Sequence, residues 1–182
     1  MRDRTLLFAF TMNDTETIFA FLNGRGIPFR AFSHERTDDL EEKLRHDAEA
    51  GVYGATHCKN LLLANRQKTR LFLLTMGFKK RFRTGPVSRQ MGSGRLNFAE
   101  EEVLARVLHT TPGTVSPLEL IFAGDEKVEY SMDRELLDAQ YLCFHPGVDT
   151  TTVVFETKVF LEQVLPALGV APRFVDMDLV EA

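Results

Sequence analysis

The sequence predicts a mixed domain of the α/β or α+β class, built around a mixed sheet. Segments with the period of amphipathic helices alternate along the chain with short apolar segments that are typical of strands. Hydrophobic residues make up 44% of the chain, and its 182 residues fit one domain with a proper core. We find no internal repeat, low-complexity segment or linker, so we expect residues 1–182 to form a single domain.

Two helices and a strand are predicted in the first 51 residues. The first helix begins at the cap-type residue Asn13, carries apolar residues at helical spacing and ends at Gly24. Apolar residues then alternate over 27–34, which predicts a strand. A second helix is expected from Thr37, as its N-cap, to Gly51, because acidic residues fill its first turn.

A hairpin is predicted next, with strands over 59–64 and 70–75 joined by the polar connector 65–69. The first strand contains three consecutive leucines, so both of its faces should be covered. Lys59 and Asn60 then lie at the edge of a buried sheet, where a rigid strand can hold a polar side chain at a pocket.

A short helix that starts at Pro86 and a strand through Leu96 and Phe98 should follow the hairpin. An amphipathic helix is predicted over 100–109. Residues 111–122 are interpreted as a turn and a strand, with a Pro-Gly pair suited to a type II turn.

The last third of the chain should contain further strands and a closing helix. We expect a strand over 127–132 that pairs with the strand before it, and a short helix over 133–140. Residues 141–147 are predicted to form a strand that runs into a turn, and residues 151–157 another strand. A late helix is expected over 158–169.

The charges are unevenly distributed along the chain. The formal charge of −4, from 22 basic and 26 acidic residues, does not by itself favour a nucleic-acid partner. However, ten basic residues and no acidic residue lie between Lys59 and Ala99, so the rest carries 12 basic against 26 acidic residues, or −14. This separation favours a local contact with a polyanion, and a merely solvated charged face is the alternative.

We expect a cytoplasmic protein that neither crosses nor enters a membrane. No segment approaches the roughly 18 apolar residues that a membrane span requires. The N-terminal residues lack the apolar core and cleavage site of a signal peptide. Cys58 and Cys143 have no CxxC spacing, which is typical of thiols that stay reduced.

Several polar residues stand at predicted strand ends and turns. They are Lys59 and Asn60, His145, and the turn Gly113–Pro117, whose backbone N–H groups could hold an oxyanion or a carbonyl group. Each has a structural alternative, because sheet-edge lysines commonly extend to solvent and loop histidines commonly satisfy local hydrogen bonds.

Metal and thiol chemistry are less well supported. His57, Cys58, Cys143 and His145 offer four potential zinc ligands, but adjacent residues on a strand point to opposite faces. A Cys58 nucleophile lacks an evident third group to orient its base. Neither GxGxxG nor GxxxxGK[ST] is present, so the common phosphate loops are absent from the sequence.

Five motifs follow one another in the order found in one known family. They are "HCKNLLL", "GSGRLNFA", "TPGTVSPLELI", "CFHPGVDTTTVVF" and a closing amphipathic helix. On these motifs the chain resembles the YbaK/ProX superfamily, and within it the freestanding ProX-type prolyl-tRNA editing proteins. The resemblance covers about Gly26 to Val175, which would be the core of the domain (26–175), and implies a mixed, largely antiparallel sheet surrounded by helices.

The resemblance implies that the chain hydrolyses the ester between tRNA(Pro) and a wrong amino acid, most often alanine. It implies no metal, no cofactor and no covalent intermediate, and it makes prolyl-tRNA synthetase a second partner. The family residues that hold the aminoacyl-adenosine end correspond to Lys59 and Asn60, and the pocket histidine corresponds to His145. The glycine and proline of a GxxxP loop correspond to Gly113 and Pro117.

In this interpretation the site positions a water molecule, stabilises the oxyanion and selects the side chain by pocket volume. Lys59 would supply positive charge, the Gly113 turn backbone donors, and His145 an orienting group. Residues expected to border the substrate are Phe144, Ser116, Pro117 and His57. Residues expected to contact tRNA are Lys79, Lys80, Arg81, Arg83 and Arg95.

The chain departs from the family pattern at two places. Cys58 stands where relatives commonly have threonine, and residues 77–90 add basic residues and a Gly-Pro pair. The amino acid removed is therefore less firmly implied than the reaction. The alternative function is a noncatalytic nucleic-acid-binding or synthetase-associated adaptor that retains the fold.

Overall fold

The computed structural model describes residues 4–177, with side chains described from residue 14 onward. The strands are β1 (Arg30–Ser33), β2 (Ala55–Asn65), β3 (Leu71–Gly77), β4 (Leu96–Phe98), β5 (Val128–Asp133), β6 (Tyr141–Phe144), β7 (Thr151–Glu156) and β8 (Arg173–Val175). The longer helices are α1 (Arg4–Gly24), α2 (Leu40–Glu49), α3 (Thr84–Gln90) and α4 (Glu101–Leu108). The shorter helical segments are η1 (Pro117–Phe122), η2 (Arg134–Asp138), α5 (Thr157–Val159), η3 (Phe160–Val164) and α6 (Leu165–Ala167).

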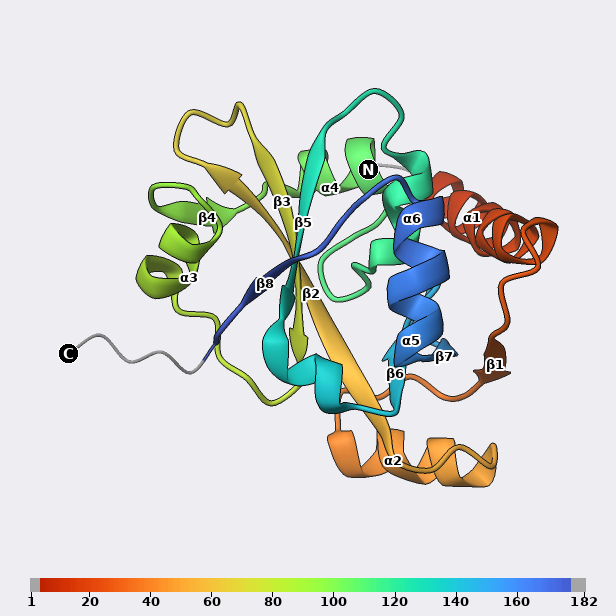
Figure 1. The fold of residues 1–182 in the computed structure, drawn as a ribbon. Helices are drawn as coiled ribbons and strands as arrows, with labels where there is room; N and C mark the ends of the chain where they lie inside the picture. The colour runs from red at the N-terminus through yellow and green to blue at the C-terminus, as the bar shows by residue number, and fades with distance from the viewer. Residues whose placement is uncertain (1–3, 178–182) are drawn as a thin grey trace.

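The strands form one mixed sheet in the order β1-β7-β6-β2-β3-β5-β8, with β4 paired to β2 beside this path (Figure 1). Four pairs are antiparallel and three are parallel. This confirms the predicted fold class and the largely antiparallel sheet surrounded by helices. In Figure 1, β2 runs from the region of α2 to the region of α3 and β4.

Both faces of β2 are covered, as its run of leucines predicts. Leu63 belongs to a smaller core with Phe72, Leu74 and Val87 of α3, and Leu61 packs against it. Leu62 faces the opposite side, where the larger core takes side chains from α1, α4, η1 and the closing helical segments. Among residues 4–177 no helix has the length and apolar character needed to cross a membrane.

Two helix starts differ from the sequence prediction. α1 begins at Arg4, upstream of Asn13, and Asp14 faces His109 instead of capping the helix, with 3.7 Å between Asp14 Oδ1 and His109 Nδ1. The N-cap of α2 is Asp39, not Thr37, because the Asp39 carboxylate accepts the Glu42 N–H at 2.9 Å. A carboxylate in this position also complements the positive end of the helix dipole.

The predicted strand within 111–122 is wrong, because residues 117–122 form the 3-10 helix η1. Ser116 and Glu119 make a capping box there, and Pro117 occupies the first turn, where its missing N–H is not needed. β5 therefore pairs with β3 and β8 and not with this segment.

Smaller differences affect other element boundaries. β2 begins at Ala55, four residues before the expected strand, and α3 begins at Thr84 instead of Pro86. The predicted helix within 133–140 is a 3-10 helix, and the late helix contains a π-helical segment. β8 was not predicted, because its three residues show no strand pattern of their own and pair with β5 only in the folded chain.

Phe144 of β6 lies in the larger core and provides a test of this packing. It is 1% exposed and stacks on Phe160, with 4.7 Å between ring centroids, and it also contacts Phe155. We expect Phe144→Ala to lower the free energy of unfolding by about 3–5 kcal/mol, because it leaves a cavity among aromatic rings. Urea denaturation measures this change.

The matched control is Phe98→Ala, because Phe98 is 65% exposed at the end of β4. Its free energy of unfolding should change by only about 0.5 kcal/mol. Equal losses for the two variants would contradict the placement of Phe144 in the core.

Candidate active site

One edge of β2 is shared between two strands, and the site lies where they part. β6 pairs with β2 as far as His57, which lies opposite Cys143. β4 pairs with β2 only from Leu63 onward, although the Ala99 N–H still reaches the Leu62 carbonyl at 2.9 Å. On this edge, the described strands leave residues 58–61 without a partner. Residues 58–61 are all partly exposed, so this stretch of β2 is a candidate contact for a ligand.

Lys59 and Asn60 lie in the gap but point to opposite faces of the sheet. Lys59 shares a face with Leu61 and Leu63, because side chains alternate along a strand. The Lys59 ammonium is half-buried and donates a hydrogen bond to the Lys80 carbonyl. Burial, followed by the nearby Arg81, lowers the pKa of Lys59 below its ordinary value.

Asn60 faces the larger core and holds the turn Gly113–Pro117 against β2. Its Nδ2 donates to the Val115 carbonyl at 3.0 Å. Its Oδ1 accepts from the Thr75 hydroxyl at 2.7 Å, and Thr75 in turn accepts from the Tyr130 hydroxyl at 2.8 Å. Because both ends of the amide are engaged in this buried chain, Asn60 positions the turn.

The turn itself has the geometry that its sequence predicts. Gly113 has a φ of +96°, and the Thr114 N–H donates to the Thr111 carbonyl at 3.2 Å across it. Gly113 is exposed, whereas Ser116 and Pro117 are buried. The exposed part of the turn can therefore approach a ligand, and the buried part anchors it.

His145 directly follows β6. The pairing of β6 with β2 ends at Cys143 and His57, so His145 lies just beyond the end of that pairing. His145 Nδ1 lies 3.0 Å from the Thr151 carbonyl, which can only accept, so Nδ1 carries the proton and Nε2 is left as an acceptor. Burial lowers the pKa of His145, and Lys43 lowers it further.

Glu119, which the sequence interpretation did not identify, connects the two loops of the site. Its Oε2 accepts the Ser116 N–H at 2.9 Å, and a Cβ at Gly147 would lie 3.9 Å from Oε1. Burial raises the pKa of Glu119 well above its ordinary value, despite the Ser116 N–H, and Asp14 raises it further. The Ser-x-x-Glu capping pattern was the sequence signal for this contact.

His57 and Phe144 were both expected beside the substrate, and both are buried in the structure. His57 Nε2 lies 2.7 Å from Asp47 Oδ2, which ties the start of β2 to α2. Phe144 occupies the aromatic core described above.

Among the described residues, Asp47, His57 and Cys143 form one cluster whose potential metal ligands lie within 4.8 Å of one another. Cys58 is not part of this cluster and packs against the larger core, as alternation along β2 predicts. Burial raises the pKa of the Cys143 thiol, and the Asp47 charge raises it further. In this arrangement His57 and Asp47 form a hydrogen-bonded pair beside the Cys143 thiol.

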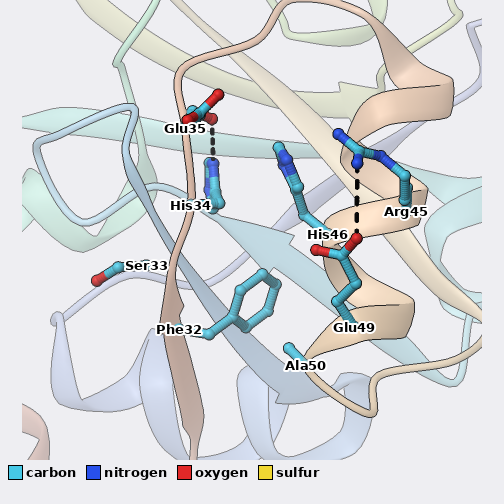
Figure 2. Close-up of a pocket in the computed structure, with 8 residues that line it drawn as sticks. All are labelled: Phe32, Ser33, His34, Glu35, Arg45, His46, Glu49 and Ala50. Atoms are coloured by element: carbon cyan, nitrogen blue, oxygen red, sulfur yellow. Dashed lines mark hydrogen bonds and ion pairs between the residues drawn. The ribbon is translucent and has the colours of Figure 1, made fainter.

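A cleft of about 540 Å³ adjoins the site between β1 and α2, and Figure 2 shows its lining. The rings of His34 and His46 stack in it at 5.2 Å, and His34 also lies 6.0 Å from the His145 ring. His34 is fixed by the Glu35 carbonyl at 2.7 Å and the Thr152 hydroxyl at 2.8 Å. The cleft thus leads along two histidines toward His145, and sequence reasoning identified neither of them.

The residues predicted to contact tRNA lie on the segment that follows β3 and, for Arg95, directly before β4. Lys79, Arg81, Arg83 and Arg95 are exposed. Lys80 differs, because its ammonium pairs with Glu135 at 2.8 Å and its side chain is only 22% exposed. The structure therefore leaves four of the five cations on the surface.

Comparison with known proteins identifies a family and several relatives. Residues 34–162 match the family model described as the aminoacyl-tRNA editing domain. The prolyl-tRNA editing protein ProX of Acetoanaerobium sticklandii is 26% identical over 87% of this chain and 94% of its own length. The mouse prolyl-tRNA synthetase associated domain-containing protein 1 is 28% identical over 86% of this chain and 92% of its own.

The fold also has solved counterparts. A crystal structure described as a candidate trans-editing enzyme for prolyl-tRNA synthetase superposes with a TM-score of 0.68 at 17% identity. The superposition covers 92% of this chain and 98% of that one. At this identity the likeness supports the fold alone.

The raised pKa of Glu119 predicts a pH-dependent effect on stability. The folded protein binds this proton more tightly than the unfolded chain, so the contribution of Glu119 to stability falls as the pH rises from the ordinary glutamate pKa through the folded pKa. Glu119→Gln removes this titration. Its free energy of unfolding, relative to that of the unsubstituted protein, should therefore rise as the pH increases above the ordinary glutamate pKa of about 4.3.

Two further variants complete the test. Glu119→Ala also removes the acceptor of the Ser116 N–H and should lose about 1–3 kcal/mol of stability. Glu162→Gln replaces an exposed glutamate and should show no such pH trend. A Glu119→Gln difference that stays constant with pH would contradict the buried carboxyl.

Proposed function

The chain belongs to the aminoacyl-tRNA editing domain family and is an aminoacyl-tRNA deacylase, and we propose that it clears mischarged tRNA(Pro), most of all Ala-tRNA(Pro), in trans. The observation that supports this proposal is the gap in the edge of β2 between His57 and Leu63, because Lys59 and Asn60 lie in it and Asn60 binds the Gly113–Pro117 turn. The names of the relatives, which concern prolyl-tRNA and its synthetase, support the choice of tRNA.

The reaction needs little from the protein, because an aminoacyl ester is already activated. A water molecule adds to the carbonyl carbon, and the bond from that carbon to the ribose oxygen breaks. The proton lost by the water ends on the ribose oxygen. The protein must hold the ester and the water together and stabilise the negative charge on the carbonyl oxygen.

Each group of the site suits one of these tasks. The Lys59 ammonium supplies positive charge to the carbonyl oxygen or to the terminal phosphate. The exposed N–H groups of the Gly113 turn offer further donors to the oxyanion. His145 Nε2 is an acceptor and can receive a hydrogen bond from the attacking water. Asn60 and Glu119 keep the turn in place for these contacts.

Selectivity for alanine would follow from the volume of the site. A synthetase that binds proline cannot fully reject a smaller side chain, because a missing methylene changes binding by only about 1–3 kcal/mol. A second site that is too small for proline removes the error by exclusion. In this proposal Ser116, Pro117, His57 and Phe144 limit that volume from buried positions behind the site.

The tRNA would approach over the acid-free segment of the chain. Lys79, Arg81 and Arg83 are exposed beside Lys59 and can meet the phosphates near the aminoacyl end. Lys80 contributes its carbonyl to Lys59 and its ammonium to Glu135, so we assign it a positioning role. Prolyl-tRNA synthetase is the expected source of the mischarged tRNA.

The central prediction is enzymatic. The protein should release labelled alanine from Ala-tRNA(Pro) while it leaves Pro-tRNA(Pro) intact. The rate of hydrolysis of Cys-tRNA(Pro) then measures how strongly the pocket discriminates between alanine and cysteine. Lys59→Ala should slow alanine release by at least about 100-fold, because it removes the charge that stabilises the oxyanion. Lys158→Ala, an exposed lysine of α5, serves as the matched control and should be fully active.

If none of the three substrates is hydrolysed, the proposed enzymatic function is wrong, and the alternative of a noncatalytic adaptor takes its place. If Lys59→Ala keeps full activity, the reaction stands but the assigned site is wrong.

The lowered pKa of His145 predicts an acid limb in the pH profile. Above the ordinary histidine pKa of about 6.5, His145 should be neutral and kcat/KM should be constant. As the pH falls through the lowered pKa, Nε2 gains a proton and can no longer accept from water, so kcat/KM should decrease. His145→Gln should lower the plateau by about 100-fold and remove this limb.

The rates are corrected for hydrolysis without protein, and His109→Asn is the control that should keep the limb. A limb that persists in His145→Gln would assign the titration to another group.

A further inference from the structure

A second concentration of positive charge lies at the other end of β2. A hollow of about 600 Å³ lies between the β2–β3 connection and the segment from α3 to β4, and it adjoins a second hollow of about 420 Å³ that is lined by α3 and this segment alone. Both are lined by Arg89 and Arg95, and the larger one also by Arg66 and Arg70. We call this surface the arginine groove. No aspartate or glutamate lines either hollow.

The arginines of the groove are presented to solvent in different ways. Arg70 is held by Glu129 at 2.7 Å and by the Gly92 carbonyl at 3.2 Å, so its position is fixed. Arg66 and Arg95 are exposed, and within residues 14–177 neither forms an ion pair. Two guanidinium groups thus remain available beside a third that is already ordered.

The backbone between α3 and β4 allows close approach. Gly94 has open space where a Cβ would lie, whereas at Gly92, which has a φ of +67°, that position is 2.8 Å from Nη1 of Arg173. Guanidinium groups bind phosphate oxygens in a bidentate manner, and glycines let a phosphate approach the main chain. Because the arginines are spread over two connected hollows, the groove suits a row of phosphates better than one small anion.

The direction of β2 relates the groove to the active site. Six residues separate Lys59 from Asn65, which corresponds to about 20 Å along a strand. A stacked RNA strand advances about 3.4 Å per nucleotide, so the same span corresponds to about six nucleotides. This length exceeds the unpaired 3′ end of a tRNA and reaches the paired acceptor stem.

α3 packs on the face of β2 that also carries Lys59, so the groove and the lysine lie on the same side of the sheet. Exposed Arg81 and Arg83 stand on the segment between them. We propose that the arginine groove binds the phosphodiester backbone of the acceptor stem while the aminoacyl ester lies at Lys59. This inference rests on the proposed function and adds to it a contact with the duplex, away from the reacting end.

The test compares a groove variant with a matched surface variant. Arg66→Gln with Arg95→Gln removes two groove charges, and Arg25→Gln with Lys158→Gln removes two exposed charges elsewhere. Binding of uncharged tRNA is measured over a range of salt concentrations. Hydrolysis is measured on aminoacyl-tRNA and on an aminoacylated CCA trinucleotide, which has no stem.

The groove variant should bind tRNA about tenfold more weakly near physiological salt, with a salt slope smaller by about 2. Its kcat/KM should fall about tenfold on aminoacyl-tRNA and stay unchanged on the trinucleotide. The control variant should match the unsubstituted protein in every measurement.

Unchanged tRNA binding in the groove variant would overturn the inference, as would an equal loss of activity on tRNA and trinucleotide. If the unsubstituted protein hydrolyses neither substrate, the proposed function fails, while the salt dependence of tRNA binding still decides whether the groove binds the stem.

Discussion

The gap in the edge of β2 is the feature on which the rest of the site depends. A strand edge buried in a sheet must satisfy its backbone groups or leave them to a ligand. β6 pairs with β2 only as far as His57, and β4 pairs with it only from Leu63 onward. On this edge of the described sheet, the residues between them can therefore be contacted only by side chains and loops. Asn60 lies in this gap and donates a hydrogen bond from its side chain to the Val115 carbonyl, which holds the glycine turn against β2. Lys59 points from the other face of the same strand.

Buried polar side chains hold the loops and strands around this gap in place. Glu119 crosses from the glycine turn toward the loop of His145, and His57 binds Asp47 across to α2. Both Asp14 and Glu119 have raised pKa values because burial disfavours their charged forms. A buried carboxyl with a hydrogen bond to only one oxygen lowers the free energy of unfolding at neutral pH, but it holds the adjoining loop in a fixed geometry. Such trade-offs are common at functional sites.

The sequence predicted the elements that have strong local signals and missed those that depend on distant contacts. The leucine hairpin and α4 follow from periodicity alone, and the motifs supply Lys59, Asn60, Gly113 and His145 as candidate site residues. η1 was mistaken for a strand because "PLELIF" is apolar, although its capping box with Ser116 was visible. β8 pairs with β5, and Glu119 approaches Gly147, so both features join residues far apart in the chain, which no local pattern records. The His34–His46 stack likewise joins two different elements. Alternation along a strand predicts that the adjacent residues Lys59 and Asn60 point to opposite faces of the sheet. Their place in one motif suggested instead that the two side chains act close together.

A crystal structure with a nonhydrolysable alanyl-adenosine amide would test the central claim most directly. We expect the amide carbonyl to lie in the gap of β2, within hydrogen-bonding distance of Lys59 Nζ or of the Gly113 turn, with the alanine methyl facing the buried side of the site. Its position near His145 Nε2 would mark the path of the attacking water. An analogue bound instead in the cleft of His34 and His46, with Lys59 still bonded to the Lys80 carbonyl, would contradict the account.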